Sequence, residues 1–182
     1  EAALRAGLKF IVNVVLDDDK QVVYVAAGAP VKAHAWLVEQ ARDLYQVPIP
    51  RQYDIVIGGV GYPKDANLYQ ASRAPSYLFF APAPVVKPGG VLIVPAPCEE
   101  GAGDGVGEQR FLKAMQEAPN VQTILDDARK YGYPPGQQRA FVIAKVLEEN
   151  EVIITGALDP ALIRSAKFLV APTLEAAFEM VS

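Results

Sequence analysis

Six polar side chains that could contact or support a ligand lie within residues 64–73 of an otherwise apolar chain. They are Lys64, Asp65, Asn67, Tyr69, Gln70 and Arg73. Gln70 and Arg73 are three residues apart, so on a helix they share one face, with Tyr69 beside them. A guanidinium group offers a planar pair of donors that matches a carboxylate or a phosphate. We therefore predict an anion site in which Tyr69, Gln70 and Arg73 contact the ligand and the other three polar residues support them. The alternative is a solvated helix face.

Two glycine-rich turns could also bind a phosphate through their backbone N–H groups. Gly59-Val60-Gly61 follows a short apolar run and precedes the polar segment, but a dinucleotide-binding turn needs a third glycine where this chain has Lys64. Residues 101–107 contain four glycines and lack the Lys and Ser or Thr of a phosphate-binding loop. We expect a flexible loop there rather than a phosphate cradle.

The chain is poor in residues that carry catalysis, because its 182 residues include one histidine and one cysteine. The single cysteine, Cys98, excludes an internal disulfide, fits a reducing compartment such as the cytoplasm and is expected to be a buried thiol. The single histidine, His34, excludes a His-rich metal site, and we expect it to be packed or hydrogen-bonded. We predict no catalytic residue and no metal ligand in this chain.

Charge and hydropathy exclude two further classes of protein. Seventeen basic residues against 21 acidic ones give a net charge of −4, which argues against a nucleic-acid partner. Apolar runs such as residues 77–86 are interrupted by prolines, so we expect no membrane span.

Hydrophobic patterning predicts two parts, residues 1–50 and residues 51–182. In the first part, apolar runs at 10–16 and 21–27 predict a β-hairpin with two apolar faces that both need cover, followed by a linking helix over 31–45. In the second part, strands alternate with helices, which predicts a layered α/β/α domain with a short, largely parallel sheet. Its expected elements are strands at 54–58, 91–94, 151–155 and 168–170, helices at 65–74, 108–117, 121–131, 136–150, 160–165 and 174–181, and turns at 81–90.

The stretch from Asp54 to Gln70 is long and specific. Its sequence, Asp-Ile-Val-Ile-Gly-Gly-Val-Gly-Tyr-Pro-Lys-Asp-Ala-Asn-Leu-Tyr-Gln, resembles the C-terminal domain of the lactate racemase family, nickel-dependent 2-hydroxyacid racemases and epimerases. There the stretch is similar to Gly-Gly-Tyr-Pro-x-Asp-x-Asn-Leu-Tyr-Gln-Ala. The resemblance continues through residues 10–16, 27–34, 87–90 and 173–177. It covers essentially the whole chain, but only the C-terminal part of the family's proteins.

The resemblance implies that this chain is the substrate-positioning part of a 2-hydroxyacid isomerase that works by hydride transfer. The nickel-pincer nucleotide and the acid–base histidines would belong to an N-terminal domain, on which the hairpin and linking helix would pack. The family presents a Tyr-Gln pair and, three residues after the Gln, a Lys to the substrate. Tyr69 and Gln70 match here, whereas Arg73 replaces the lysine, which implies a different choice of substrate.

The expected partners are therefore a small 2-hydroxyacid and the protein's own N-terminal domain. Because the chain starts at Glu1 rather than Met, we expect a fragment that is inactive by itself. Two alternatives remain: a non-catalytic small-molecule or phosphate-binding module, and an assembly domain that docks through its apolar hairpin.

Overall fold

The computed structural model describes residues 2–181, and the chain divides into two compact units, Glu1–Pro48 and Ile49–Ser182. None of the helices within residues 2–181 is long and apolar enough to cross a membrane.

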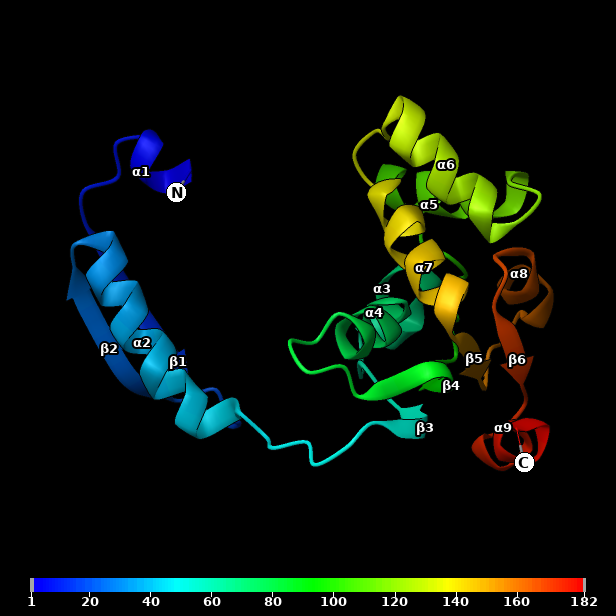
Figure 1. The fold of residues 1–182 in the computed structure, drawn as a ribbon, viewed down its shortest axis with the longest axis horizontal. Helices are drawn as coiled ribbons and strands as arrows, with labels where there is room; N and C mark the ends of the chain where they lie inside the picture. Colours follow the sequence, from blue (N-terminus) through cyan, green and yellow to red (C-terminus); the bar gives the residue numbers. More distant parts are fainter. Residues whose placement is uncertain (1, 182) are drawn as a thin grey trace. The chain divides into compact units, whose positions relative to one another are not determined.

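The first unit is an antiparallel hairpin with a helix along one of its faces (Figure 1). Strands β1 (Ile11–Leu16) and β2 (Val22–Gly28) follow a short helix, α1 (Ala2–Arg5), and precede helix α2 (Pro30–Tyr45). Side chains alternate across a strand, so every second residue faces α2. On that side Val15 is buried, and the Tyr24 ring meets the Trp36 ring of α2 edge to face at 5.9 Å.

The opposite face of the hairpin is apolar and has no cover within this unit. Its exposed side chains are Phe10, Val12, Val14, Val23 and Val25. We expected both faces of the hairpin to be covered, and within this unit α2 covers only one of them.

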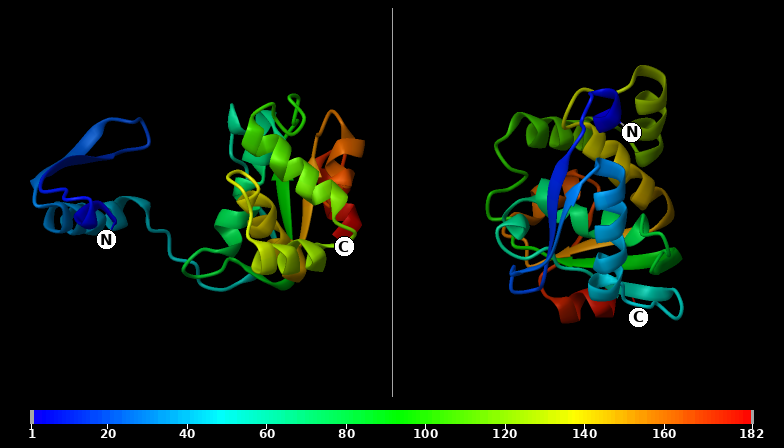
Figure 2. Two further views of the ribbon diagram at one scale, coloured as in Figure 1. Left: turned by 90° about the horizontal axis from the view of Figure 1, so that it is seen from above. Right: turned by 90° about the vertical axis from the view of Figure 1, so that its left-hand side faces the viewer.

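The second unit is a four-stranded parallel sheet with helices on both sides (Figures 1 and 2). Strands β3 (Tyr53–Ile57), β4 (Val86–Pro95), β5 (Glu151–Thr155) and β6 (Leu169–Ala171) pair in chain order. Because right-handed crossovers in chain order place their helices on one face, a single helical layer carries nearly all the connections. These are η1 (Lys64–Ala66), α3 (Leu68–Ala71), α4 (Arg73–Phe79), α5 (Val106–Glu117), α6 (Val121–Tyr131), α7 (Gln138–Glu149) and α8 (Pro160–Ser165).

Helix α9 (Leu174–Val181) covers the other face, so the sheet is buried on both sides. Leu92 and Ile154 face the main helical layer, whereas Ile93 and Ile153 pack toward α9. This burial explains why the strands are continuously apolar rather than alternating. The predicted layered α/β/α fold with a parallel sheet and a preceding hairpin is confirmed.

Two predicted segments differ from the structure. The helix expected over 65–74 is instead divided into η1, α3 and α4. The turns expected at 81–90 end at Val85, because β4 already begins at Val86 and runs through Pro88-Gly89-Gly90. The register shifts there, with Tyr53 opposite Val86 and Ile55 opposite Val91, so the prolines and glycines form an irregular part of the strand rather than a free turn.

Candidate functional site

The predicted site lies just beyond the carboxyl end of β3, where open parallel sheets bind their ligands. Residues 58–63 lead from the strand into η1, α3 and α4. The neighbouring strand β4 ends at Pro95, and its following loop lies against the same segment, because the N–H groups of Cys98 and Glu100 donate to the carbonyls of Asp65 and Ala66. The two loops thus hold each other in place at this edge of the sheet.

Asn67 and Ser72 divide the helix that periodicity predicted to be continuous. Asn67 is extended (φ −138°, ψ 152°), and its Oδ1 accepts the N–H of Gln70 at 2.9 Å, so it caps α3. Ser72 separates α3 from α4, and its hydroxyl donates to the carbonyl of Tyr69 at 2.7 Å. The two breaks place Gln70 and Arg73 on successive short helices, with their side chains in contact.

Arg73 joins two of its neighbours through its guanidinium group. Its Nε donates to Oε1 of Gln70 at 2.7 Å, and its Nη1 donates to the hydroxyl of Tyr77 at 3.3 Å. Because Arg73 occupies the amide oxygen of Gln70, the NH2 group of that amide is left to donate to a ligand. The structure therefore brings Gln70 and Arg73 together, as their spacing predicted, and adds Tyr77, which lies four residues after Arg73 on α4.

A second arginine, Arg139 on α7, reaches the same place from far along the chain. Its guanidinium carbon lies 5.7 Å from the centre of the Tyr69 ring, and its Nη1 donates to Oγ of Ser76 at 3.0 Å. The Tyr69 ring also meets Phe111 edge to face at 5.6 Å, which fixes its orientation. We call Tyr69, Gln70, Arg73, Tyr77 and Arg139 the donor cluster.

The sequence analysis did not place Arg139 at the site. Tyr77 was missed, although its spacing from Arg73 is that of helical neighbours. Arg139 had no comparable signal, because its place depends on how α7 packs on α4.

The field at the donor cluster is positive. The pKa of Tyr77 lies below its usual value, first because its hydroxyl accepts a hydrogen bond from Arg73. The positive charges of Arg73, Arg139 and Lys64 lower this pKa further. Burial, and then the like charge of Arg73, lowers the pKa of the Arg139 guanidinium. Arg73 and Arg139 take part in none of the ion pairs found among residues 2–181. Apart from the exposed Tyr77, the cluster is a half-buried set of donors, and no ion pair joins it to an acidic residue within residues 2–181.

The three supporting residues have different roles. Asn67 is buried and acts through its cap, with its Nδ2 also 3.4 Å from Oε2 of Glu100. Lys64 is exposed in η1 and adds its charge to the field at Tyr77. Asp65 acts through its backbone carbonyl, which accepts the N–H of Cys98. Burial, and then the charge of the Asp65 carboxylate, raises the pKa of Cys98 to about 12. The expectation of a buried free thiol at Cys98 is confirmed.

In the glycine-rich loop 101–107, N–H groups that a phosphate would need as donors already make hydrogen bonds within the protein. The N–H groups of Gly101 and Gly103 donate to the carbonyls of Cys98 and Glu100, and that of Gly105 donates to Oε2 of Glu108 at 2.7 Å. The carbonyl of Gly101 in turn accepts the N–H of Leu68 at 2.8 Å. The loop supports α3 instead of lying free, and these donors are not available to an anion.

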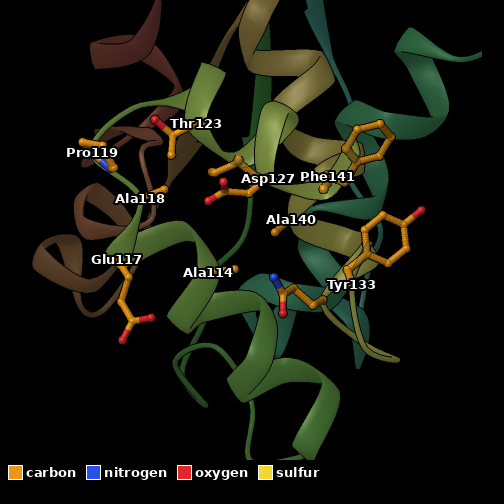
Figure 3. Close-up of a pocket in the computed structure, with 12 residues that line it drawn as sticks. Ala114, Glu117, Ala118, Pro119, Thr123, Asp127, Tyr133, Ala140 and Phe141 are labelled. Atoms are coloured by element: carbon orange, nitrogen blue, oxygen red, sulfur yellow. The ribbon is translucent and has the colours of Figure 1, made fainter. Parts of the chain in front are cut away.

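A hollow of about 240 Å³ lies elsewhere, among α5, α6 and α7 (Figure 3). The rings of Tyr133 and Phe141 stand on one side of it and the carboxylate of Glu117 on the opposite side. None of the six predicted site residues lines it. Gln137 faces this hollow while Arg139, two residues later, reaches the donor cluster.

The described residues offer no donor set for a metal ion. Within residues 2–181, no group of three or more His, Cys, Asp or Glu side chains could hold one. Cys98 is buried, and His34 lies exposed on α2, so the expectation of a packed histidine is wrong.

The comparisons with known proteins agree with this fold. The family model described as the lactate racemase C-terminal domain matches residues 50–182. The chain belongs to the lactate racemase C-terminal domain family. It is 34% identical over 183 residues to the lactate racemase of Lactiplantibacillus plantarum, covering 98% of this chain and 41% of that protein. It is 31% identical over 153 residues to the lactate racemase of Thermoanaerobacterium thermosaccharolyticum, covering 84% and 35% respectively.

Solved structures show the same relationship. The lactate racemase apoprotein from T. thermosaccharolyticum superposes with a TM-score of 0.82 at 29% identity, over 98% of this chain and 42% of that one. A protein from Thermotoga maritima shares the fold, with a TM-score of 0.59 at 17% identity over 90% of this chain and 42% of that one. The chain thus spans about two fifths of the length of the relatives that it matches.

Proposed function

We propose that this chain is the substrate-positioning part of a 2-hydroxyacid racemase or epimerase. Arg73, Gln70 and Tyr69 bind the carboxylate and hydroxyl of a small 2-hydroxyacid. The observation that carries the proposal is the donor cluster itself, because Arg73 and Gln70 are bonded to each other at 2.7 Å and still have donors to spare. Such a pre-arranged set of donors suits an anion and orients it without further rearrangement.

Contacts within the protein hold the donor cluster in place, which favours positioning over simple capture. The Asn67 cap, the Ser72 bond and the contact of Tyr69 with Phe111 each fix one part of it. A half-buried position lowers the local dielectric, so that each charged hydrogen bond is stronger than it would be in water. A bound 2-hydroxyacid would therefore be held in one orientation by several short bonds.

The chemistry of hydride transfer belongs, in this proposal, to the rest of a longer cytoplasmic protein. The family resemblance implies a nickel-pincer nucleotide, but the residues described here do not fit metal binding, since the thiol is buried and the imidazole of His34 lies exposed in the other unit. We assign this chain no step that involves the cofactor. By itself the chain binds 2-hydroxyacids and does not turn them over.

The boundary between the two parts of the chain fits the same proposal. Residues 1–50 form the part that faces the N-terminal domain, and residues 51–182 form the C-terminal domain that carries the substrate site. The family match over residues 50–182 and the apolar open face of the hairpin support this division.

Substitution of Arg73 tests the proposed function in a cofactor-loaded protein of the relatives' full length. Loss of a charged hydrogen bond to the substrate should lower kcat/KM by about 10- to 100-fold in Arg73→Gln. Arg73→Lys keeps the charge and loses the fork, so its loss should be smaller. Arg129→Gln, which removes an exposed arginine paired with Asp126 on α6, is the matched control and should be silent. Unchanged kcat/KM in Arg73→Gln would contradict the proposal.

The phosphate-binding alternative is tested with the chain alone. Titration with ATP and NAD should leave the backbone signals of residues 101–107 unshifted, because the N–H groups of Gly101, Gly103 and Gly105 already donate to acceptors within the protein. Saturable shifts at both glycine-rich turns would favour that alternative.

A further inference from the structure

Arg139 is not needed to bind a single carboxylate, because Arg73 and Gln70 already present donors for one. It belongs to a different helix, and one of its five donors is used on Ser76. Its guanidinium lies over the Tyr69 ring, so the two arginines are held on neighbouring parts of one cluster. The cluster therefore contains two guanidinium groups where the proposed carboxylate anchor requires one.

The two guanidinium groups repel each other and are only partly hydrated. Both residues are half-buried, and neither has an acidic partner among residues 2–181. Lys64 adds a third positive charge to the same field. The chain has a net charge of −4, yet three cations lie together here, so the local field favours the binding of an anion.

The packing of Arg139 shows that its position is fixed. Ser76 accepts from Arg139 at 3.0 Å while its own hydroxyl donates to the carbonyl of Arg73 at 2.9 Å. One buried serine thus ties the side chain of Arg139 to the backbone of Arg73. This link holds the Arg139 guanidinium beside the backbone of Arg73, while Gln70 and Tyr77 hold the Arg73 guanidinium. Both forks are thus held in place, which is what the recognition of a ligand with two anionic groups requires.

From this arrangement we infer that the substrate is a 2-hydroxyacid with a second anionic group, which Arg139 binds while Arg73 binds the carboxylate next to the hydroxyl. This inference rests on the proposed function and names its class of substrate. A carboxylate and a phosphate both match a guanidinium fork, so the second group is one of these two. Arg139 is then the residue that selects dianionic over monoanionic substrates.

The test measures binding to the 182-residue chain by NMR, following the side-chain Nε–Hε signals of Arg73 and Arg139. The ligands are lactate, malate and 3-phosphoglycerate, which are 2-hydroxyacids with no second anionic group, a second carboxylate and a phosphate respectively. All titrations are made at one ionic strength, because screening changes the attraction of any anion to a basic site. We expect malate or 3-phosphoglycerate to bind about tenfold more tightly than lactate, and the stronger of the two identifies the second group.

Variants separate this inference from the proposed function. Arg139→Gln should remove the preference by weakening the binding of malate or 3-phosphoglycerate far more than that of lactate, whereas Arg73→Gln should weaken both. Arg139→Lys retains the charge and should keep part of the preference, which shows that a loss in Arg139→Gln is not a folding defect. Arg129→Gln is again the control for the loss of a distant arginine.

Equal affinities of the unmodified chain for lactate, malate and 3-phosphoglycerate would overturn the inference and leave the role of Arg73 standing. A dianion preference that survives Arg139→Gln would overturn the assignment of Arg139. Lactate binding that is insensitive to Arg73→Gln, or no binding of any of the three acids, would overturn the proposed function and this inference with it.

Discussion

Asn67 and Ser72 show how single residues set the geometry of the donor cluster. Both are buried, both use a side-chain oxygen to bond a nearby backbone group, and both stand where a longer helix would otherwise continue. Asn and Ser compete with helical hydrogen bonds in this way, which is why they favour caps over helix interiors. The sequence contained this signal, but the polar periodicity of residues 65–74 outweighed it in the prediction of one continuous helix.

Cys98 gives the protein a stability that depends on pH. Burial, with the charge of Asp65 as a second cause, raises its pKa from 9.0 to about 12, so the folded thiol stays protonated while the unfolded one ionises above pH 9. Between these values the unfolded state binds fewer protons, so the free energy of unfolding falls as pH rises. A difference of one pKa unit between the folded and unfolded thiol corresponds to about 1.4 kcal/mol in the free energy of unfolding.

Urea unfolding at pH 8 and pH 10 checks this prediction against the variant Cys98→Ala, which lacks the thiol. Between pH 8 and pH 10 the free energy of unfolding should fall by about 1 kcal/mol more in the unmodified chain than in the variant. The tyrosines and lysines titrate equally in both proteins. A parallel fall in both proteins would show that Cys98 does not titrate differently in the folded and unfolded states.

At the scale of elements, the close approach of two glycines sets the entry of α7 and hence the place of Arg139. Gly136 has a φ of +93°, and a Cβ there would lie 2.1 Å from Cα of Gly107, near the start of α5. No side chain fits between these backbones, so the two helices must part if Gly136 gains one. Gly132 offers a matched control, because its φ is +71° and a Cβ there meets nothing within 4 Å.

We therefore expect Gly136→Ala to destabilise the chain more than Gly132→Ala. Both lose the freedom of glycine at a positive φ, about 1 kcal/mol each, while Gly136→Ala also overlaps the neighbouring backbone, on the order of 1–3 kcal/mol more. Urea denaturation followed by circular dichroism measures the difference. Equal destabilisation by the two substitutions would mean that α5 and α7 can move apart without lowering the free energy of unfolding.

The elements themselves were largely predictable, and their irregularities were not. Helices at 121–131, 160–165 and 174–181 and the strand at 151–155 coincide with α6, α8, α9 and β5, because apolar periodicity and prolines mark them locally. The strand β4 extends back across Pro88-Gly89-Gly90 because Asn150, at the end of α7, donates to the carbonyls of Lys87 and Gly90. Such support comes from far along the chain, as does the placement of Arg139, and no local pattern announces either.

At the scale of the whole molecule, the open face of the hairpin is the feature that contacts within its own unit leave uncovered. Val12 is 67% exposed and Val25 58% exposed on a strand pair whose other face is covered by α2. Exposed apolar sheets of this kind mark surfaces that another part of a protein covers. We propose as the occupant the remaining part of the longer protein, since the matched relatives are more than twice as long as this chain.

Replacing Val25 with threonine, which has nearly the same shape, tests that occupant. Val25 is exposed in its own unit, so in the isolated chain Val25→Thr should change the free energy of unfolding by less than about 0.5 kcal/mol. In a protein of the relatives' full length the same hydroxyl would be buried against apolar groups, which should cost about 1–3 kcal/mol. Val106→Thr, at a residue 67% exposed at the start of α5, is the control and should be silent in both proteins. If Val25→Thr is equally harmless in both, the rest of the protein does not cover this face. A second copy of this chain would then be the occupant to examine, by the dependence of the isolated chain's molecular mass on concentration.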